Sequence, residues 1–205
     1  MAEEEHTAEA PHTAEVAQMT GMPPMLVYTI RGGLNRGETP LVRVGQGASA
    51  KAFWPQPATD DSYYIVILDA NNPANKVKDF AFAGTNNHAV PGGLDQYLSN
   101  PGYIFALVTQ SLSSFHVPQG DFYDLLAAHG AGRELRQLEQ INTTLGCGSP
   151  ILVSYALTGQ CGPSPNVAYE RGSVSSKVWI LMSLMPLPNG QPPYSICDSN
   201  TFFTR

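Results

Sequence analysis

Tyr63-Tyr64-Ile65-Val66-Ile67-Leu68 decides the fold, because these residues are apolar or aromatic without interruption. Asp60-Asp61 precedes the run, and the turn-forming residues 69–73 follow it. A short apolar run between such boundaries is typical of a strand that is buried on both faces. We therefore expect a central strand at 63–68, with other elements packed on each side of it.

Further strand signals lie before and after this run. The segment 25–31 is rich in β-branched and aromatic residues and ends at the turn Gly32-Gly33. The segment 41–44 alternates in character and stops at Gly45, so a hairpin of the two segments is expected. Four more apolar runs are expected to be strands: 77–83, 103–109, 150–157 and 177–185.

Three short helices are expected between the strands. Apolar residues spaced by three and four positions predict helices at 92–99 and 133–145. Asp121 is expected to cap a helix at 122–129, which Gly130 closes. The expected fold class is α+β, with a mixed β-sheet or sandwich-like body at 25–185 and two or three short helices.

The charge of the chain is concentrated at its N-terminus. Its 205 residues include 11 basic and 17 acidic side chains, which gives a net charge of −6. Residues 1–24 contribute five glutamates and no Lys or Arg, so the remaining body is close to neutral. The segment is poor in large apolar groups, and we interpret it as a flexible or partner-ordered arm, with a solvated tail as the alternative. Because acidic residues outnumber basic ones, we do not expect the protein to bind nucleic acids by neutralising their phosphates.

Targeting and cysteine signals indicate a reducing compartment. The N-terminus offers neither the basic start nor the apolar stretch of a secretory signal, and the apolar run 178–185 is too short to span a membrane. The cysteines, Cys147, Cys161 and Cys197, are too few and too far apart for a zinc ribbon. We expect free thiols and a protein made in the cytoplasm, without membrane insertion.

Catalytic motifs are missing from the sequence. It contains no Gly-x-Ser-x-Gly elbow, no His-Glu-x-x-His and no phosphate-binding Gly-x-x-x-x-Gly-Lys-Ser/Thr. His88, His116 and His129 are not spaced as metal ligands, and Asp60-Asp61 is better explained as a turn or cap. The sequence therefore predicts a protein that is not an enzyme, with no catalytic residues, no metal and no cofactor.

Candidate ligand-binding residues lie in predicted loops. Trp54 is followed by Pro55 and Pro57, which keep it out of a strand and favour an exposed ring that stacks on a sugar or a neighbour. A ring lying over the edge of the core is the alternative. Two further loops present amides and an imidazole that suit hydroxyl groups, although ordinary turn roles also explain them. Their candidate residues are Asn71, Asn72, Asn87 and His88.

Several strings follow the order found in one known family. They are 28–35, 41–44, 65–72, 80–82, 93–98 and 102–108. Their order and spacing over about residues 25–162 resemble the interleukin-like EMT inducer and pancreatic-derived factor (ILEI/PANDER, or GG) domain family. The resemblance implies a non-enzymatic binding module similar to a carbohydrate-binding unit. The cysteines of the secreted family members are absent between 25 and 146, and the helix 133–145 and the segment after 177 are additions.

The extensions at both ends favour a role in assembly. The acidic arm 1–24 and the Pro-rich tail 186–205 are typical of subunits of viral or phage particles, in which such segments reach neighbouring subunits. We therefore expect a structural or accessory subunit, such as a phage tail or capsid decoration, that contacts copies of itself or other subunits. A free carbohydrate-binding module with a glycan ligand is the alternative, and a hydrolase is less favoured.

Overall fold

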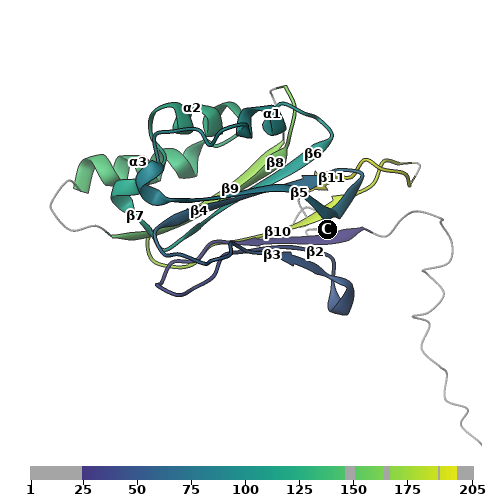
Figure 1. Cartoon of the computed structure of the whole chain (residues 1–205), viewed down its shortest axis with the longest axis horizontal. Helices are drawn as coiled ribbons and strands as arrows, with labels where there is room; N and C mark the ends of the chain where they lie inside the picture. The colour runs from purple at the N-terminus through teal and green to yellow at the C-terminus, as the bar shows by residue number, and fades with distance from the viewer. Residues whose placement is uncertain (1–24, 146–150, 164–166, 189, 198–205) are drawn as a thin grey trace, which may run out of the picture.

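The computed structural model describes residues 25–145, 151–163, 167–188 and 190–197. Three layers are stacked in this part of the chain (Figure 1). A layer of helices covers one sheet, and that sheet packs with its other face on a second sheet. The molecule is thus a two-sheet sandwich with helices on one outer side.

The first sheet has five antiparallel strands. Its order is β11 (Ser195–Cys197), β10 (Trp179–Met185), β1 (Leu26–Arg31), β2 (Leu41–Val44) and β3 (Lys51–Phe53). The hairpin of β1 and β2 confirms the pairing expected from the sequence. On its other side β1 pairs with β10, about 150 residues further along the chain.

The second sheet lies between the helices and the first sheet. Its strands are β5 (Asn72–Ala83), β4 (Ser62–Asp69), β6 (Tyr103–Gln110), β8 (Leu152–Gln160), β7 (Leu112–Ser113) and β9 (Ala168–Ser173). β8 pairs with β6 and β7 and also with β9, and β5 is an edge strand that pairs with β4.

The alternation along β4 explains why this sheet supports two cores. Tyr63, Ile65 and Ile67 belong to the core under the helices, whereas Tyr64 and Val66 belong to the core between the sheets. Successive side chains of a strand point to opposite faces, so an uninterrupted apolar run fills both cores. The prediction of a central strand buried on both faces is confirmed.

The helices are α1 (Leu94–Leu98), α2 (Gly120–Ala128) and α3 (Arg133–Leu145), with single 3₁₀ turns η2 (Gly47–Ser49), η3 (Gly84–Asn86) and η4 (Ser114–His116). α1 and α3 confirm the predicted helices. The predicted capping role of Asp121 is wrong, because α2 begins earlier and Gln119 occupies the N-cap position. Asp121 lies instead in the first turn, where its charge favours the helix dipole.

The predicted α+β class with a mixed sheet is wrong. Every pairing between the named strands is antiparallel, and more residues lie in strands than in the three helices. Four strands, β3, β7, β9 and β11, were not expected, because their apolar patterns are short or weak. A pattern of side chains identifies a strand but not the direction of its partner, and the direction separates mixed from antiparallel sheets.

The C-terminal segment also differs from the expected tail. β11 pairs with β10, and the backbone N–H of Tyr194 donates to the carbonyl of Ala70 at 2.7 Å. The described part of this segment, up to Cys197, therefore belongs to the sandwich and does not extend from it. The predicted arm 1–24 and residues 198–205 lie outside the described residues.

Candidate functional site

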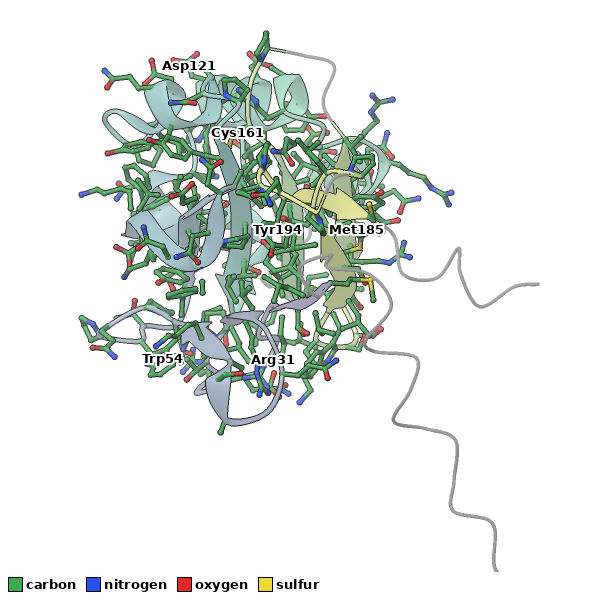
Figure 2. The ribbon with its side chains drawn as sticks, turned by 90° about the vertical axis from the view of Figure 1, so that its right-hand side faces the viewer. Arg31, Trp54, Asp121, Cys161, Met185 and Tyr194 are labelled. Atoms are coloured by element: carbon green, nitrogen blue, oxygen red, sulfur yellow. The ribbon has the colours of Figure 1, made fainter. Side chains whose placement is uncertain are left out.

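A groove opens beside Trp54, at the end of β3 and on the side of the molecule away from the helices (Figure 2). Its volume is about 450 Å³. The lining residues are Arg31, Thr39, Pro40, Leu41, Trp54, Pro55, Gln56, Pro57 and Ala58. We call this the Trp54 groove. Concave sites that combine an aromatic ring with a few polar groups are the ordinary form of a ligand site.

Trp54 owes its position to the end of β3. The strand stops at Phe53, and the prolines at 55 and 57 cannot donate to a neighbouring strand. The indole is 43% exposed, so of the two interpretations left open by the sequence, the structure shows the exposed ring. A partly exposed indole offers a flat apolar face together with one N–H donor.

Arg31 supplies the charge of the Trp54 groove, as the one charged residue among the described residues that line it. Its Nη2 donates to the carbonyl of Thr39 at 2.9 Å. Its Cζ lies 5.2 Å from the centre of the Trp179 ring, directly across from it on β10. Both contacts fix the guanidinium, which keeps further N–H donors for an acceptor in the groove.

A second hollow of about 240 Å³ is also lined by Trp54 and lies between β3 and β5. The Tyr64 hydroxyl donates to Asp79 Oδ2 at 2.9 Å, and Lys76 Nζ donates to the same oxygen at 2.7 Å. Burial by itself raises the pKa of Asp79, but the hydrogen bonds from Lys76 and Tyr64 outweigh it and lower the pKa. A fixed carboxylate, an ammonium and an indole therefore share one short stretch of surface.

The outer face of the five-stranded sheet continues from the Trp54 groove. Residues of β1 and β10 that alternate with the core residues point to this face, and Trp179 and Leu181 are 49% and 55% exposed. Arg31 and Arg43 lie on the same face. The helices lie on the far side of the molecule (Figure 1), and the outer face is open at Trp179 and Leu181 but covered at Ser183, which is only 3% exposed. We call it the outer sheet face.

The two amide-rich loops lie at opposite ends of β5 and do not form one site. Asn71 and Asn72 lie at its start, and Asn87 and His88 follow its end, about 35 Å of strand away. Asn71 bonds to Asp69, as expected of a turn residue. None of these four residues lines the Trp54 groove.

Asn87 and His88 make hydrogen bonds that hold their loop in place. Asn87 is only 3% exposed, and its Nδ2 donates to the carbonyl of Val117 at 2.8 Å. The carbonyl of His88 accepts from Phe122 N, while the rest of the residue is exposed. Asn87 therefore fixes the polypeptide after η4 and offers little to a ligand.

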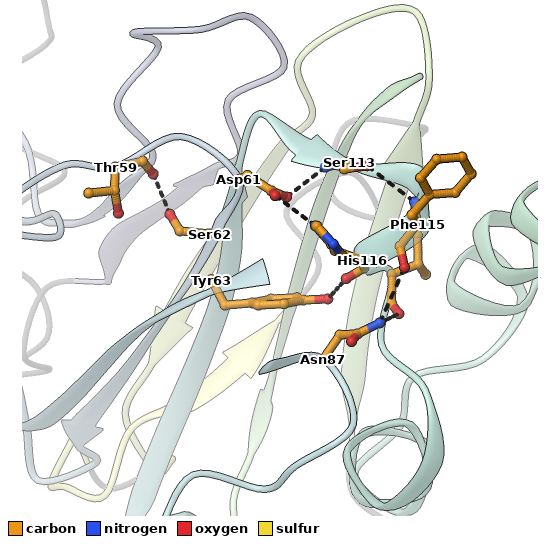
Figure 3. A network of polar contacts seen from close by, with 9 residues as sticks. Thr59, Asp61, Ser62, Tyr63, Asn87, Ser113, Phe115 and His116 are labelled. Atoms are coloured by element: carbon orange, nitrogen blue, oxygen red, sulfur yellow. Dashed lines mark hydrogen bonds and ion pairs between the residues drawn. The ribbon is translucent and has the colours of Figure 1, made fainter. Parts of the chain in front are cut away.

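A histidine–carboxylate pair lies directly before the start of β4 (Figure 3). Asp61 Oδ2 lies 2.6 Å from His116 Nδ1, and Asp61 Oδ1 accepts from the backbone N–H of Ser113 at 2.9 Å. The Tyr63 hydroxyl donates to the carbonyl of His116. Sequence reasoning assigned Asp61 to a turn or cap but gave no signal for His116, which lies 55 residues away.

The neighbouring hydroxyls make contacts of their own. Ser62 Oγ donates to the carbonyl of Thr59, and Ser113 Oγ accepts from Phe115 N. In the described part of the chain these contacts, and not the imidazole, engage the two hydroxyls. The contacts described for the pair hold the 3₁₀ turn Ser114–His116 against β4.

Comparison with known proteins adds no family to this picture, since neither a family model nor a curated protein sequence matches the chain. The resemblance to the ILEI/PANDER family stays a prediction. Among the described residues, no helix is long and apolar enough to cross a membrane, and no group of His, Cys, Asp or Glu could hold a metal ion.

Two of the three cysteines lie in the described part of the chain. Cys161 and Cys197 are both free thiols, and Cys147 lies outside the described residues. Burial raises the pKa of Cys161 to about 12. A thiol with such a pKa is a poor nucleophile, so the structure gives Cys161 a packing role.

Proposed function

We propose that the protein is a non-catalytic structural or accessory subunit of a larger particle and binds neighbouring subunits through the outer sheet face. The exposure of Trp179 and Leu181, side by side on β10, is the observation that supports this proposal. Large apolar side chains gathered on one face of a soluble protein are typical of protein interfaces. Trp and Arg, which meet here in the stacked pair Arg31–Trp179, are the residues that contribute most to such interfaces.

Light scattering and sedimentation of the full chain at micromolar concentration test the proposal. We expect association that Trp179→Ala combined with Leu181→Ser weakens about tenfold or more, because a central aromatic anchor contributes about 2 kcal/mol. Phe115→Ala is the control, since Phe115 is also exposed, at 45%, but lies in η4. A stable monomer would contradict the proposal.

A free carbohydrate-binding module is the second candidate, and the Trp54 groove supports it. An exposed indole, a fixed guanidinium and the Gln56 amide line one concave surface. Sugar rings bind to protein through stacking of their C–H faces on aromatic rings and through hydrogen bonds to their hydroxyls. The residues of the groove offer both kinds of contact.

A glycan array with the full chain tests this second candidate. We expect at least one glycan to bind, and Trp54→Ala to weaken that binding about tenfold, because the stacking surface is removed. Phe115→Ala serves again as the control, because it removes an equally exposed aromatic ring outside the Trp54 groove. Absence of binding to every glycan, or binding that Trp54→Ala leaves unchanged, would remove this candidate.

A further inference from the structure

We propose that the outer sheet face binds the acidic N-terminal segment 1–24 of a neighbouring copy of the chain. The inference rests on the proposed function, because it names the partner of the same face. The five strands of that sheet contain no Asp or Glu. Arg31 and Arg43 belong to the outer sheet face, whereas Lys51, opposite Val44, belongs to the other face of the sheet.

The segment 1–24 has the complementary composition. Its five glutamates are accompanied by no Lys or Arg, and it accounts for most of the net charge of −6. Arginine binds carboxylates with paired N–H donors, and Arg31 and Arg43 each use Nη2 for one backbone carbonyl. A guanidinium carries five N–H groups, so Arg31 and Arg43 have further donors from which glutamates can accept.

The charge of the face favours the acidic segment over a second outer sheet face. Two outer sheet faces in contact would bring arginines together, whereas the acidic segment pairs them with carboxylates. The segment is also long enough: five strands of up to seven residues span about 20 Å by 20 Å, and an extended chain covers about 3.3 Å per residue.

The point of attachment favours a neighbouring copy. Segment 1–24 joins β1, which is the middle strand of this sheet, and Arg31 lies at the far end of β1, about 17 Å from Leu26. To reach Arg31 on its own sheet, the segment would have to reverse before β1. Pro23 and Pro24 fix their own φ and bias the residue before each of them to extended backbone, which favours a departure away from the sheet over a reversal at that point. The sheet of another copy needs no such reversal.

A labelled synthetic peptide of residues 1–24 tests the inference. It is titrated by fluorescence anisotropy against the full chain that carries Glu→Gln at 3, 4, 5, 9 and 15, so that the chain's own segments do not compete. We expect binding that weakens as salt is raised, and that Arg31→Gln with Arg43→Gln weakens about tenfold. Arg43→Gln alone, at an exposed side chain, is expected to weaken it about threefold.

Two controls make the outcome specific. Arg133→Gln with Arg136→Gln removes the same charge from α3, on the far side of the molecule, and should leave binding unchanged. A peptide with the five glutamates replaced by glutamine should not bind. Absence of binding by the natural peptide, or equal weakening by both arginine pairs, overturns the inference. If association of the full chain still depends on Trp179 in that case, the proposed function stands without it.

Discussion

Gly33 joins the two sheets of the sandwich. Its backbone N–H donates to the carbonyl of Thr109 in β6 at 2.9 Å, and its carbonyl accepts from Ser111 at 3.0 Å. A Cβ at this position would overlap the backbone carbonyl of Glu38. Only glycine allows the chain to pass from β1 to the second sheet at so close a distance. The glycine pair that appeared as a turn signal is thus a contact between sheets.

We predict that Gly33→Ala destabilises the protein by about 1–3 kcal/mol or more, because backbone atoms have to move to admit the methyl group. Urea unfolding measures the change. Gly92→Ala is the matched control, since a Cβ there meets no atom within 4 Å, and it should shift the midpoint little. Equal effects of the two substitutions would contradict this account of Gly33.

Glu38 stabilises the same turn through its carboxylate. Hydrogen bonds from the backbone N–H groups of Leu34 and Asn35 are the main cause that lowers its pKa from 4.5 to about 2. The unfolded chain binds this proton more readily than the folded chain. The contribution of Glu38 to stability is therefore present above pH 4.5 and is lost as the pH falls towards 2.

The expected result is a difference in stability between the natural protein and Glu38→Gln that is largest near pH 7 and shrinks below pH 4.5. The difference is small, because the side chain is partly exposed. Urea unfolding of both proteins between pH 7 and pH 2.5 measures it. A difference that stays constant over this range would show that the charge of Glu38 is not the cause.

At the scale of elements, a carboxylate of the sheet binds the start of α3. Glu170 of β9 accepts from the backbone N–H groups of Glu134 at 2.8 Å and Leu135 at 3.3 Å, and from the Tyr155 hydroxyl at 2.8 Å. The first N–H groups of a helix have no partner within the helix, and a negative charge there also favours the helix dipole. The contact replaces an N-cap side chain with one from another element.

Glu170→Ala should therefore loosen the start of α3 and cost about 1–2 kcal/mol, as the loss of a helix cap does. Hydrogen exchange of the amides of residues 134–137 reports the change directly. Glu139→Ala, in the middle of the same helix, is the control and should leave their exchange close to that of the natural protein. Unchanged exchange in Glu170→Ala would show that packing alone holds the helix.

The elements found from the sequence are those with a strong period. The bounds of α3 agree with the predicted helix at 133–145, because its apolar residues repeat as one face of a helix requires. β3, β7, β9 and β11 were missed because they are short or carry polar or small residues. Their strand conformation comes from pairing with a neighbour, which a local pattern does not record.

At the scale of the whole molecule, the second sheet joins the two cores. Neighbouring residues of one strand, such as Tyr63 and Tyr64, are buried in different cores. The core under the helices therefore cannot lose its sheet without exposing the core between the sheets. This arrangement favours a single cooperative unfolding transition.

We expect tryptophan fluorescence and far-UV circular dichroism to give the same urea midpoint. Trp54 and Trp179 report on the side of the five-stranded sheet, whereas the helical signal comes from α2 and α3 on the opposite side. Both signals should change together if the central sheet couples the cores. Two separate midpoints would show that the helical layer unfolds independently.

The candidate site was only partly visible in the sequence. Trp54 could be selected because the prolines after it exclude a strand. Trp179 and Arg31 could not be linked, because they meet only through the pairing of β1 with β10. Asn87 had the composition of a surface loop, yet the structure buries it against the carbonyl of Val117.

The sequence by itself determined the buried central strand, the predicted helices at 92–99 and 133–145 and the concentration of charge in residues 1–24. These features depend on local composition and on the spacing of apolar residues, so each can be predicted from a single segment of the sequence. The tertiary structure alone decided that both sheets are antiparallel, that the segment up to Cys197 completes one of them, and that Arg31 lies between Trp54 and Trp179. These features depend on contacts between residues far apart in the chain, where the partner is chosen by packing of the whole molecule.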